Sequence, residues 1–180
     1  IRQLKGPHKL ICRHLSEHSL KDVVKTMLME SNNYIANQLL LTLAYNEYGE
    51  GVTITDGVAV LSAFLKTEIK LDTGDFNIVE GSGLSTQNHI DLLAMLKVLN
   101  YFTDFKELLP PLSLSKYRGL ARTGRKWKIL AKTGTLKNVA TLAGYLLVEN
   151  KEWKPFVIML NESDAPRSKV LEIIAKYYNG

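Results

Sequence analysis

The hydrophobic period of the chain changes at the proline pair Pro110 and Pro111, and this change limits the folds that the sequence can adopt. Before the prolines, apolar residues recur at the three- and four-residue spacing of amphipathic helices. After them, short aliphatic and aromatic runs alternate with turn residues, which is typical of strands. The predicted helices cover residues 20–29, 34–49, 53–66 and a stretch from Ser85 or Thr86 to Asn100, and the predicted strands cover residues 126–133, 139–150 and 154–161.

One more helix is predicted to close the chain, beginning near Ser163 or Asp164 with Pro166 in its first turn. Its apolar stripe consists of Val170, Leu171, Ile174 and Tyr178. A hairpin near Asn150 and Lys151 would make the last two strands antiparallel. Helices followed by antiparallel strands indicate an α+β fold. We expect a helical part at about 19–109, a sheet part at about 126–162 and a closing helix at about 164–178.

Composition narrows the possible partners. The net charge is +5, but eight basic and no acidic residues lie between positions 116 and 137, which leaves −3 for the remainder. Such a basic segment favours nucleic acid, a polyanionic polymer or a substrate carboxylate, unless it is only a solvated face. Cys12 is the sole cysteine, so an internal disulfide and a cysteine-rich zinc site are excluded. No apolar run is long enough for a transmembrane segment, and no cofactor or metal is expected.

The sequence Lys132, Thr133, Gly134, Thr135 follows an apolar strand. Because side chains alternate along a strand, Lys132 and Gly134 should face one side and the two threonines the other. A strand glycine indicates close approach by a ligand or another backbone. The segment could bind an extended peptide at its edge and a carboxylate through the ammonium and a hydroxyl. The alternative is an ordinary strand end with a turn glycine.

A second polar group interrupts the first two predicted helices at Ser31, Asn32 and Asn33. In a broken helix, Ser31 and Asn33 can share a face, as residues two apart do in an extended segment. They would then offer a hydroxyl that relays a proton and an amide that binds a peptide bond. The alternative is a polar loop between helices.

Together the segments ESNNYIANQLL, EGSGLS and AKTGTLKNVATLAGYL resemble the class C low-molecular-mass penicillin-binding proteins, the D-alanyl-D-alanine carboxypeptidase/endopeptidase family, from about residue 20 to the C-terminus. The resemblance implies the penicillin-binding, serine β-lactamase-like transpeptidase fold, with a helical subdomain and an antiparallel sheet. It also implies hydrolysis of peptidoglycan peptides ending in D-Ala-D-Ala through an acyl-enzyme, inhibition by β-lactams, and a periplasmic or other extracytoplasmic location. Nucleic acid is not an expected partner.

The resemblance also implies residue roles. Ser31 would pass a proton to the departing amine, Asn33 would hold the substrate amide, and Lys132 would supply positive potential. Thr133 and Thr135 would bind the terminal carboxylate, with the Thr135 N–H forming half of the oxyanion hole. Gly134 would keep the strand open for the peptide.

The sequence departs from the family pattern at several positions. Asn32, Glu80, Thr86 and Thr141 stand where Asp, Asp, Arg and Asn are expected. Residues 1–30 lack the S-x-x-K nucleophile motif that should precede Ser31. The chain is therefore expected to be the C-terminal part of one penicillin-binding domain, incomplete and inactive alone, with the nucleophile encoded upstream. The single S-x-x-K, Ser113 to Lys116, follows the prolines in a predicted loop and is not expected to be the nucleophile.

Other functions remain open at this point. His14, Glu17 and His18 spell the inverted zinc-protease motif H-x-x-E-H, but Ser19 is predicted to cap the next helix, so the motif would lie outside it. The chain could also be a non-catalytic binder of cell-wall peptide or of an anionic polymer through its basic segment. A family member that keeps the fold without catalysis is the third alternative.

Overall fold

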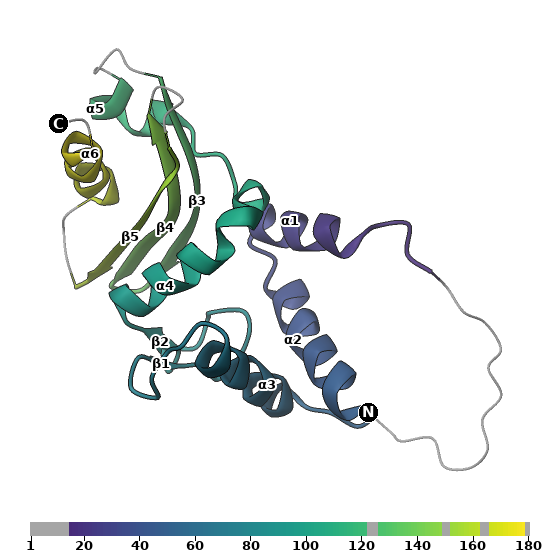
Figure 1. The fold of residues 1–180 in the computed structure, drawn as a ribbon. Helices are drawn as coiled ribbons and strands as arrows, with labels where there is room; N and C mark the ends of the chain where they lie inside the picture. The colour runs from purple at the N-terminus through teal and green to yellow at the C-terminus, as the bar shows by residue number, and fades with distance from the viewer. Residues whose placement is uncertain (1–14, 122–125, 149–151, 163–165, 179–180) are drawn as a thin grey trace, which may run out of the picture.

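A computed structural model describes residues 15–121, 126–148, 152–162 and 166–178 (Figure 1). A helical part precedes a three-stranded sheet, and a last helix packs on that sheet. The helices are α1 (Leu20–Glu30), α2 (Asn33–Tyr48), α3 (Ile54–Thr67), α4 (Leu92–Phe102), α5 (Arg118–Ala121) and α6 (Arg167–Tyr177), with 3-10 helices η1 (Thr103–Leu108) and η2 (Leu114–Lys116). The strands are β1 (Phe76–Asn77), β2 (His89–Ile90), β3 (Trp127–Leu136), β4 (Val139–Val148) and β5 (Lys154–Asn161).

Two of the helix starts are stabilised by capping boxes. Ser19 caps α1 and Thr53 caps α3, each accepting a hydrogen bond from the backbone N–H three residues on. In return, Asp22 and Asp56 accept from the backbone N–H of the cap residue. These reciprocal bonds satisfy donors that a helix start otherwise leaves unpaired.

The start of the fourth predicted helix is wrong. Instead of beginning at Ser85 or Thr86, α4 begins at Leu92 with Asp91 as its N-cap. The preceding residues form a loop and β2, because the Glu80 carboxylate accepts the Ser85 N–H at 3.2 Å and a side-chain N–H of Asn88 at 2.5 Å. Hydrogen bonds to the Glu80 carboxylate therefore outweigh the local propensity to start a helix at Ser85 or Thr86.

The larger sheet has the order β3-β4-β5, with both pairs antiparallel, as predicted for the last two strands. The expected hairpin at Asn150 and Lys151 lies outside the described residues. Between β3 and β4 the chain turns at Lys137 and Asn138, and Asn138 has a φ of 64°. Asparagine tolerates this left-handed conformation better than most residues.

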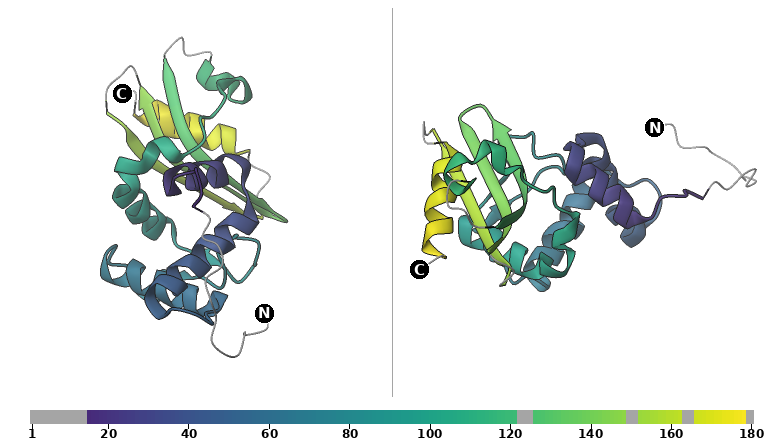
Figure 2. Two further views of the ribbon diagram at one scale, coloured as in Figure 1. Left: turned by 90° about the vertical axis from the view of Figure 1, so that its right-hand side faces the viewer. Right: turned by 90° about the horizontal axis from the view of Figure 1, so that it is seen from above.

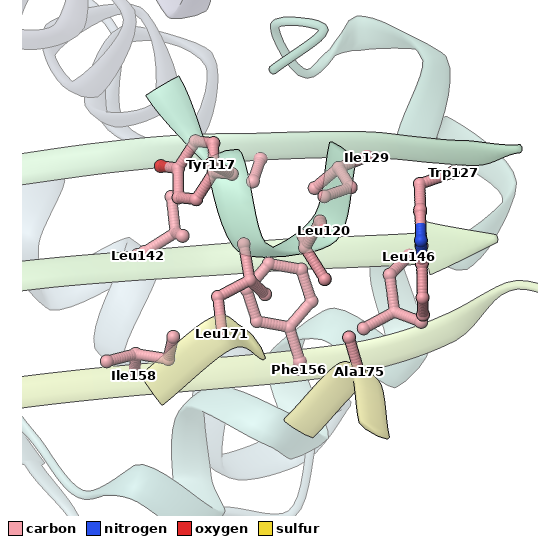
Figure 3. Close-up of a cluster of buried hydrophobic side chains, with 11 residues drawn as sticks. Tyr117, Leu120, Trp127, Ile129, Leu142, Leu146, Phe156, Ile158, Leu171 and Ala175 are labelled. Carbon is pink, nitrogen blue, oxygen red and sulfur yellow. The ribbon is translucent and has the colours of Figure 1, made fainter. Parts of the chain in front are cut away.

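Helices cover both faces of the sheet (Figure 2). On one face, α6 packs against β4 and β5, and Leu171 and Ala175 join a buried cluster that includes Trp127, Ile129 and Phe156 (Figure 3). On the other face, Leu99 of α4 and Tyr145 of β4 form a second cluster with Leu109. The sheet is thus buried on both sides.

The closing helix differs from its prediction at both ends. It begins at Arg167 with Pro166 as its N-cap, so Pro166 precedes the first turn, and the predicted starting residues Ser163 and Asp164 lie outside the described residues. Val170, Leu171 and Ile174 pack on the sheet as expected. Tyr178 follows the helix as its C-cap and is 41% exposed, so it does not extend the buried stripe.

Candidate active site

The polar break between α1 and α2 is built by two different caps. Ser31 ends α1 in the left-handed conformation, with φ 55° and ψ 47°. Asn32 then begins α2, its side-chain oxygen accepting the Ile35 N–H at 3.0 Å. Asp and Asn cap helices about equally well, which explains why Asn can occupy a position where the family motif has Asp. The predicted interruption of the helix is confirmed.

Ser31 meets Lys132, although 101 residues separate them in sequence. The Lys132 ammonium donates a hydrogen bond to the Ser31 hydroxyl oxygen at 2.5 Å and another to the Thr133 carbonyl at 3.0 Å. Burial of the ammonium lowers the pKa of Lys132 below its ordinary value of 10.5. The structure therefore joins the two separate sequence motifs through one charged hydrogen bond.

Lys132 and the two threonines lie on opposite faces of β3, as the strand alternation predicts. Trp127, Ile129 and Ala131 belong to the cluster under α6, so Thr133 and Thr135 point toward that same face. Both threonines are exposed. Their hydroxyls are therefore not gathered with Ser31 and Lys132 on one face, and the two groups can meet a common ligand only at the edge of the strand.

That edge of β3 is covered along only part of its length. The Leu112 N–H donates to the Ile129 carbonyl at 2.8 Å, and the Ala131 N–H donates to the Pro110 carbonyl at 2.9 Å. Backbone groups alternate in direction along an edge strand, so those of Thr133 and Thr135 point the same way as those of Ala131. Within the described residues, no segment pairs with β3 beyond Ala131 on this side. The edge there can receive an extended peptide.

The reason for glycine at position 134 differs from the sequence interpretation. A Cβ added to Gly134 would overlap the hydroxyl oxygen of Thr141, its partner across the strand pair. The space above Gly134 on this face is therefore filled by Thr141 and is not open backbone. The glycine accommodates a neighbouring side chain, and only the strand edge remains open.

Asn33 is the first residue of α2 and is exposed. In the described part of the chain its side-chain amide has no hydrogen-bond partner. One helical turn later, Asn37 accepts the Gly81 N–H at 2.8 Å, and a Cβ at Gly81 would lie 2.8 Å from the Ala36 carbonyl. The EGSGLS loop therefore rests on α2. This role of Asn37 was not predicted from the sequence. Its one sequence signal is that Asn37 follows Asn33 by four residues, about one helical turn.

The loop is organised by the Glu80 carboxylate. It accepts hydrogen bonds from the N–H and hydroxyl of Ser82, both at 2.5 Å, besides those from Ser85 and Asn88. Partial burial alone would raise the pKa of Glu80, but these hydrogen bonds outweigh it, and the net pKa lies below the ordinary value.

A family model, described as the D-Ala-D-Ala carboxypeptidase 3 (S13) family, matches residues 2–176. The chain belongs to this family. Its relatives include the D-alanyl-D-alanine carboxypeptidase DacB of Haemophilus influenzae, which is 30% identical over 95% of this chain and 39% of the relative. The predicted family resemblance is confirmed, and the chain spans about two fifths of the curated relative's length.

Solved structures agree with the fold. The crystal structure of penicillin binding protein 4 (dacB) from H. influenzae has a TM-score of 0.70 and 28% identity, covering 88% of this chain and 38% of that one. A predatory endopeptidase from Bdellovibrio bacteriovorus, solved with an immunity protein, has a TM-score of 0.62 and 24% identity, covering 88% and 43%. The second likeness bears on the fold alone. The predicted α+β, penicillin-binding fold is confirmed.

The other motifs from the sequence join no site with Ser31 and Lys132. Ser113 precedes η2, and its hydroxyl lies 2.8 Å from the Ser115 hydroxyl. His14 lies outside the described residues, while Glu17 and His18 form a bend before α1. Across the described ranges, no three His, Cys, Asp or Glu side chains gather as a metal site. In these same ranges, no helix combines the length and apolarity needed to cross a membrane.

Proposed function

We propose that this S13 family chain is part of a serine-type D-alanyl-D-alanine carboxypeptidase or endopeptidase that acts on peptidoglycan peptides through an acyl-enzyme. The observation that carries the proposal is the 2.5 Å hydrogen bond from Lys132 to Ser31. It unites the two polar motifs at the uncovered end of the β3 edge. The catalytic roles of Ser31, Asn33 and Lys132 are part of the proposal.

The chemistry of Ser31 follows from which atom donates. Because the Lys132 ammonium donates to the Ser31 oxygen, the serine's own proton is directed elsewhere and can pass to a departing amine as a proton of the ammonium passes to the serine oxygen. Removal of charged groups from water strengthens their electrostatic effect, so the desolvated ammonium adds positive potential where an anion binds. Asn33, with an unoccupied amide close in sequence to Ser31, would hold the substrate's amide.

Substrate would bind along the open edge of β3. An extended peptide can pair there with the backbone groups of Thr133 and Thr135, and the Thr135 N–H would supply half of an oxyanion hole. The Thr133 and Thr135 hydroxyls would receive the terminal carboxylate, with Thr135 the main contact. Gly134 contributes to this edge by accommodating Thr141, which keeps the strand pair regular.

The nucleophile in this proposal is a serine outside the motifs found here, since residues 1–30 contain no S-x-x-K. A peptidoglycan substrate would place the protein outside the cytoplasmic membrane, in the bacterial envelope. β-Lactams, which mimic the D-Ala-D-Ala terminus, would acylate the same nucleophile. The H. influenzae structure with a bound β-lactam supports this expectation by relationship.

Intact mass spectrometry with a labelled penicillin tests the proposal, using the protein at its full encoded length. We expect a stoichiometric adduct and acylation at least about 100-fold slower in Lys132→Ala and Ser31→Ala. Lys128→Ala is the matched control, because Lys128 is an exposed lysine four residues earlier on the same face of β3. Absence of an adduct in the unsubstituted protein would contradict the proposal that this protein is a serine-type peptidase. Equal losses of acylation rate in Lys128→Ala and Lys132→Ala would mean that the positive charge of this face promotes acylation without a specific contribution from the Lys132–Ser31 contact.

A further inference from the structure

Arg167, the first residue of α6, reaches back to the strand pair that carries the lysine motif. One terminal nitrogen of its guanidinium donates to the Gly134 carbonyl at 3.0 Å and to the Thr141 carbonyl at 2.8 Å. Gly134 and Thr141 are partners across β3 and β4. A single side-chain atom therefore bridges both strands one residue before Thr135.

The position of Arg167 is unfavourable for the helix itself. A helix start carries a partial positive charge and favours acidic residues, yet the first turn of α6 has none, and its N-cap Pro166 offers no side-chain hydrogen bond. In the described part of the chain, no carboxylate lies within ion-pair distance of Arg167. Helix stability and ion pairing therefore do not explain an arginine at this position.

Arg167 approaches the strands from the face opposite the Lys132 side chain. It lies four residues before Leu171 and eight before Ala175, which are both buried against the sheet, so the three residues share the sheet-facing stripe of α6. The sheet consequently separates the guanidinium from the Lys132–Ser31 pair. Arg167 acts on the motif through the backbone.

The backbone groups of Gly134 point toward β4. Ile129 and Ala131 direct theirs to the outer edge, so the alternation turns those of Gly134 inward, where they pair with Thr141. Each carbonyl has a second lone pair, and Arg167 can use it without displacing the strand hydrogen bond. Charge-assisted hydrogen bonds of this kind are stronger than neutral ones.

We propose that Arg167 is a positioning residue that fixes the backbone at Gly134 and thereby directs the neighbouring Thr135 N–H out of the β3 edge. Glycine has the most backbone freedom of any residue, and the turn at Lys137 and Asn138 follows closely, so this end of β3 needs an external restraint. Arg167 supplies that restraint from α6. The consequence for acylation rests on the proposed function, whereas the restraint on the strand does not.

Hydrogen exchange in the protein at its full encoded length tests the restraint independently of activity. In Arg167→Ala we expect amides between residues 133 and 142 to exchange about 10-fold faster, while those of β5 and the end of α6 stay unchanged. Lys169→Ala is the matched control, because Lys169 is an exposed cation in the same turn of α6. Arg167→Lys should give an intermediate effect. Equal exchange in the Arg167 and Lys169 variants, or faster exchange spread over the whole sheet, would overturn the proposal.

Acylation by penicillin tests the consequence. Misplacement of a reacting group by about 1 Å can cost about 100-fold in rate, so Arg167→Ala should acylate about 10- to 100-fold more slowly. The loss should be the same for a β-lactam with a free carboxylate and for its methyl ester. A loss confined to the free acid would mean that the guanidinium binds substrate directly, which would overturn a positioning role. If the unsubstituted protein forms no adduct, the proposed function fails and the exchange experiment still decides the role of Arg167.

Discussion

The buried hydroxyl of Tyr145 donates a hydrogen bond to the carbonyl of Leu99 and so ties the middle strand of the sheet to α4. This contact lies in the cluster between the sheet and the helical part. It links the part of the chain that carries Ser31 with the strands that carry Lys132. Its loss should therefore weaken the packing that brings the two motifs together.

Replacement of Tyr145 by phenylalanine tests this link. We expect Tyr145→Phe to lower the free energy of unfolding by about 1 kcal/mol, since the ring remains and a single buried hydrogen bond is lost. Urea denaturation measures the change. Tyr177→Phe, at a tyrosine that is 82% exposed, should have no measurable effect. Equal stability of the two variants would mean that the Tyr145 hydroxyl does not hold α4 to the sheet.

The overlap at Gly134 predicts non-additive energetics. Gly134→Ala should destabilise the protein by about 1–3 kcal/mol, because its new Cβ meets the Thr141 hydroxyl in a packed strand pair. Thr141→Ala removes that oxygen and leaves its own Cβ at an ordinary distance of 3.8 Å from the new atom. A double-mutant cycle should then show that Gly134→Ala costs much less in the Thr141→Ala background. In Thr141→Ser, which keeps the oxygen, the full cost should return.

Desolvation of Lys132 predicts that this residue destabilises the folded protein at neutral pH. Its pKa is lower in the folded state than the ordinary 10.5, so the unfolded state binds more protons between those two values. The folded protein therefore carries a penalty at neutral pH that is relieved as the pH rises toward 10.5. Lys132→Met should therefore be more stable than the unsubstituted protein at pH 7, with the gain limited by solvent screening of the partly exposed ammonium. The gain should shrink when unfolding is repeated at pH 10, and a gain independent of pH would contradict this account.

Acidification should weaken the hydrogen bonds that hold the EGSGLS loop, because it protonates the Glu80 carboxylate that accepts them. The folded-state pKa of Glu80 lies below its ordinary 4.5, so its contribution to stability is present above that value and is lost as the pH falls through the folded pKa. At pH 7, Glu80→Gln should be about 1 kcal/mol less stable. The difference should decrease below about pH 4.5 in denaturant titrations followed across pH. Glu50→Gln, at an exposed glutamate after α2, is the control and should show no such difference.

Local signals predicted much of the fold because the contacts they describe are local. Ser19 with Asp22 and Thr53 with Asp56 are each three residues apart, and the structure contains both boxes. The predicted start of the fourth helix was wrong because the Ser85 N–H donates a hydrogen bond to the Glu80 carboxylate, five residues earlier in the chain. Asp91, directly before a continuous apolar run, was the signal that could have corrected it.

At the candidate site, the sequence identified the candidate residues but did not predict how their side chains are arranged in space. The alternation along β3 separated Lys132 from Thr133 correctly, because a strand repeats every two residues. The filling of Gly134 by Thr141 depends on the register across a hairpin, which no single motif encodes. The bridge from Arg167 depends on where α6 crosses the sheet. In the sequence, Arg167 is marked only as a cation in a helix start that has no acidic residue, and this feature could not be interpreted without the structure.

The segment at residues 110–112 limits the length of the β3 outer edge that is open for backbone pairing. It occupies that edge as far as Ala131, so the free part runs from Lys132 to the end of the strand at Leu136. At about 3.4 Å per residue this leaves roughly 17 Å of backbone. An extended chain laid there abuts the proline segment at one end and leaves over the hairpin turn at the other. Under the proposed function, the proline segment would therefore limit how far a bound peptide can extend along β3 beyond Lys132.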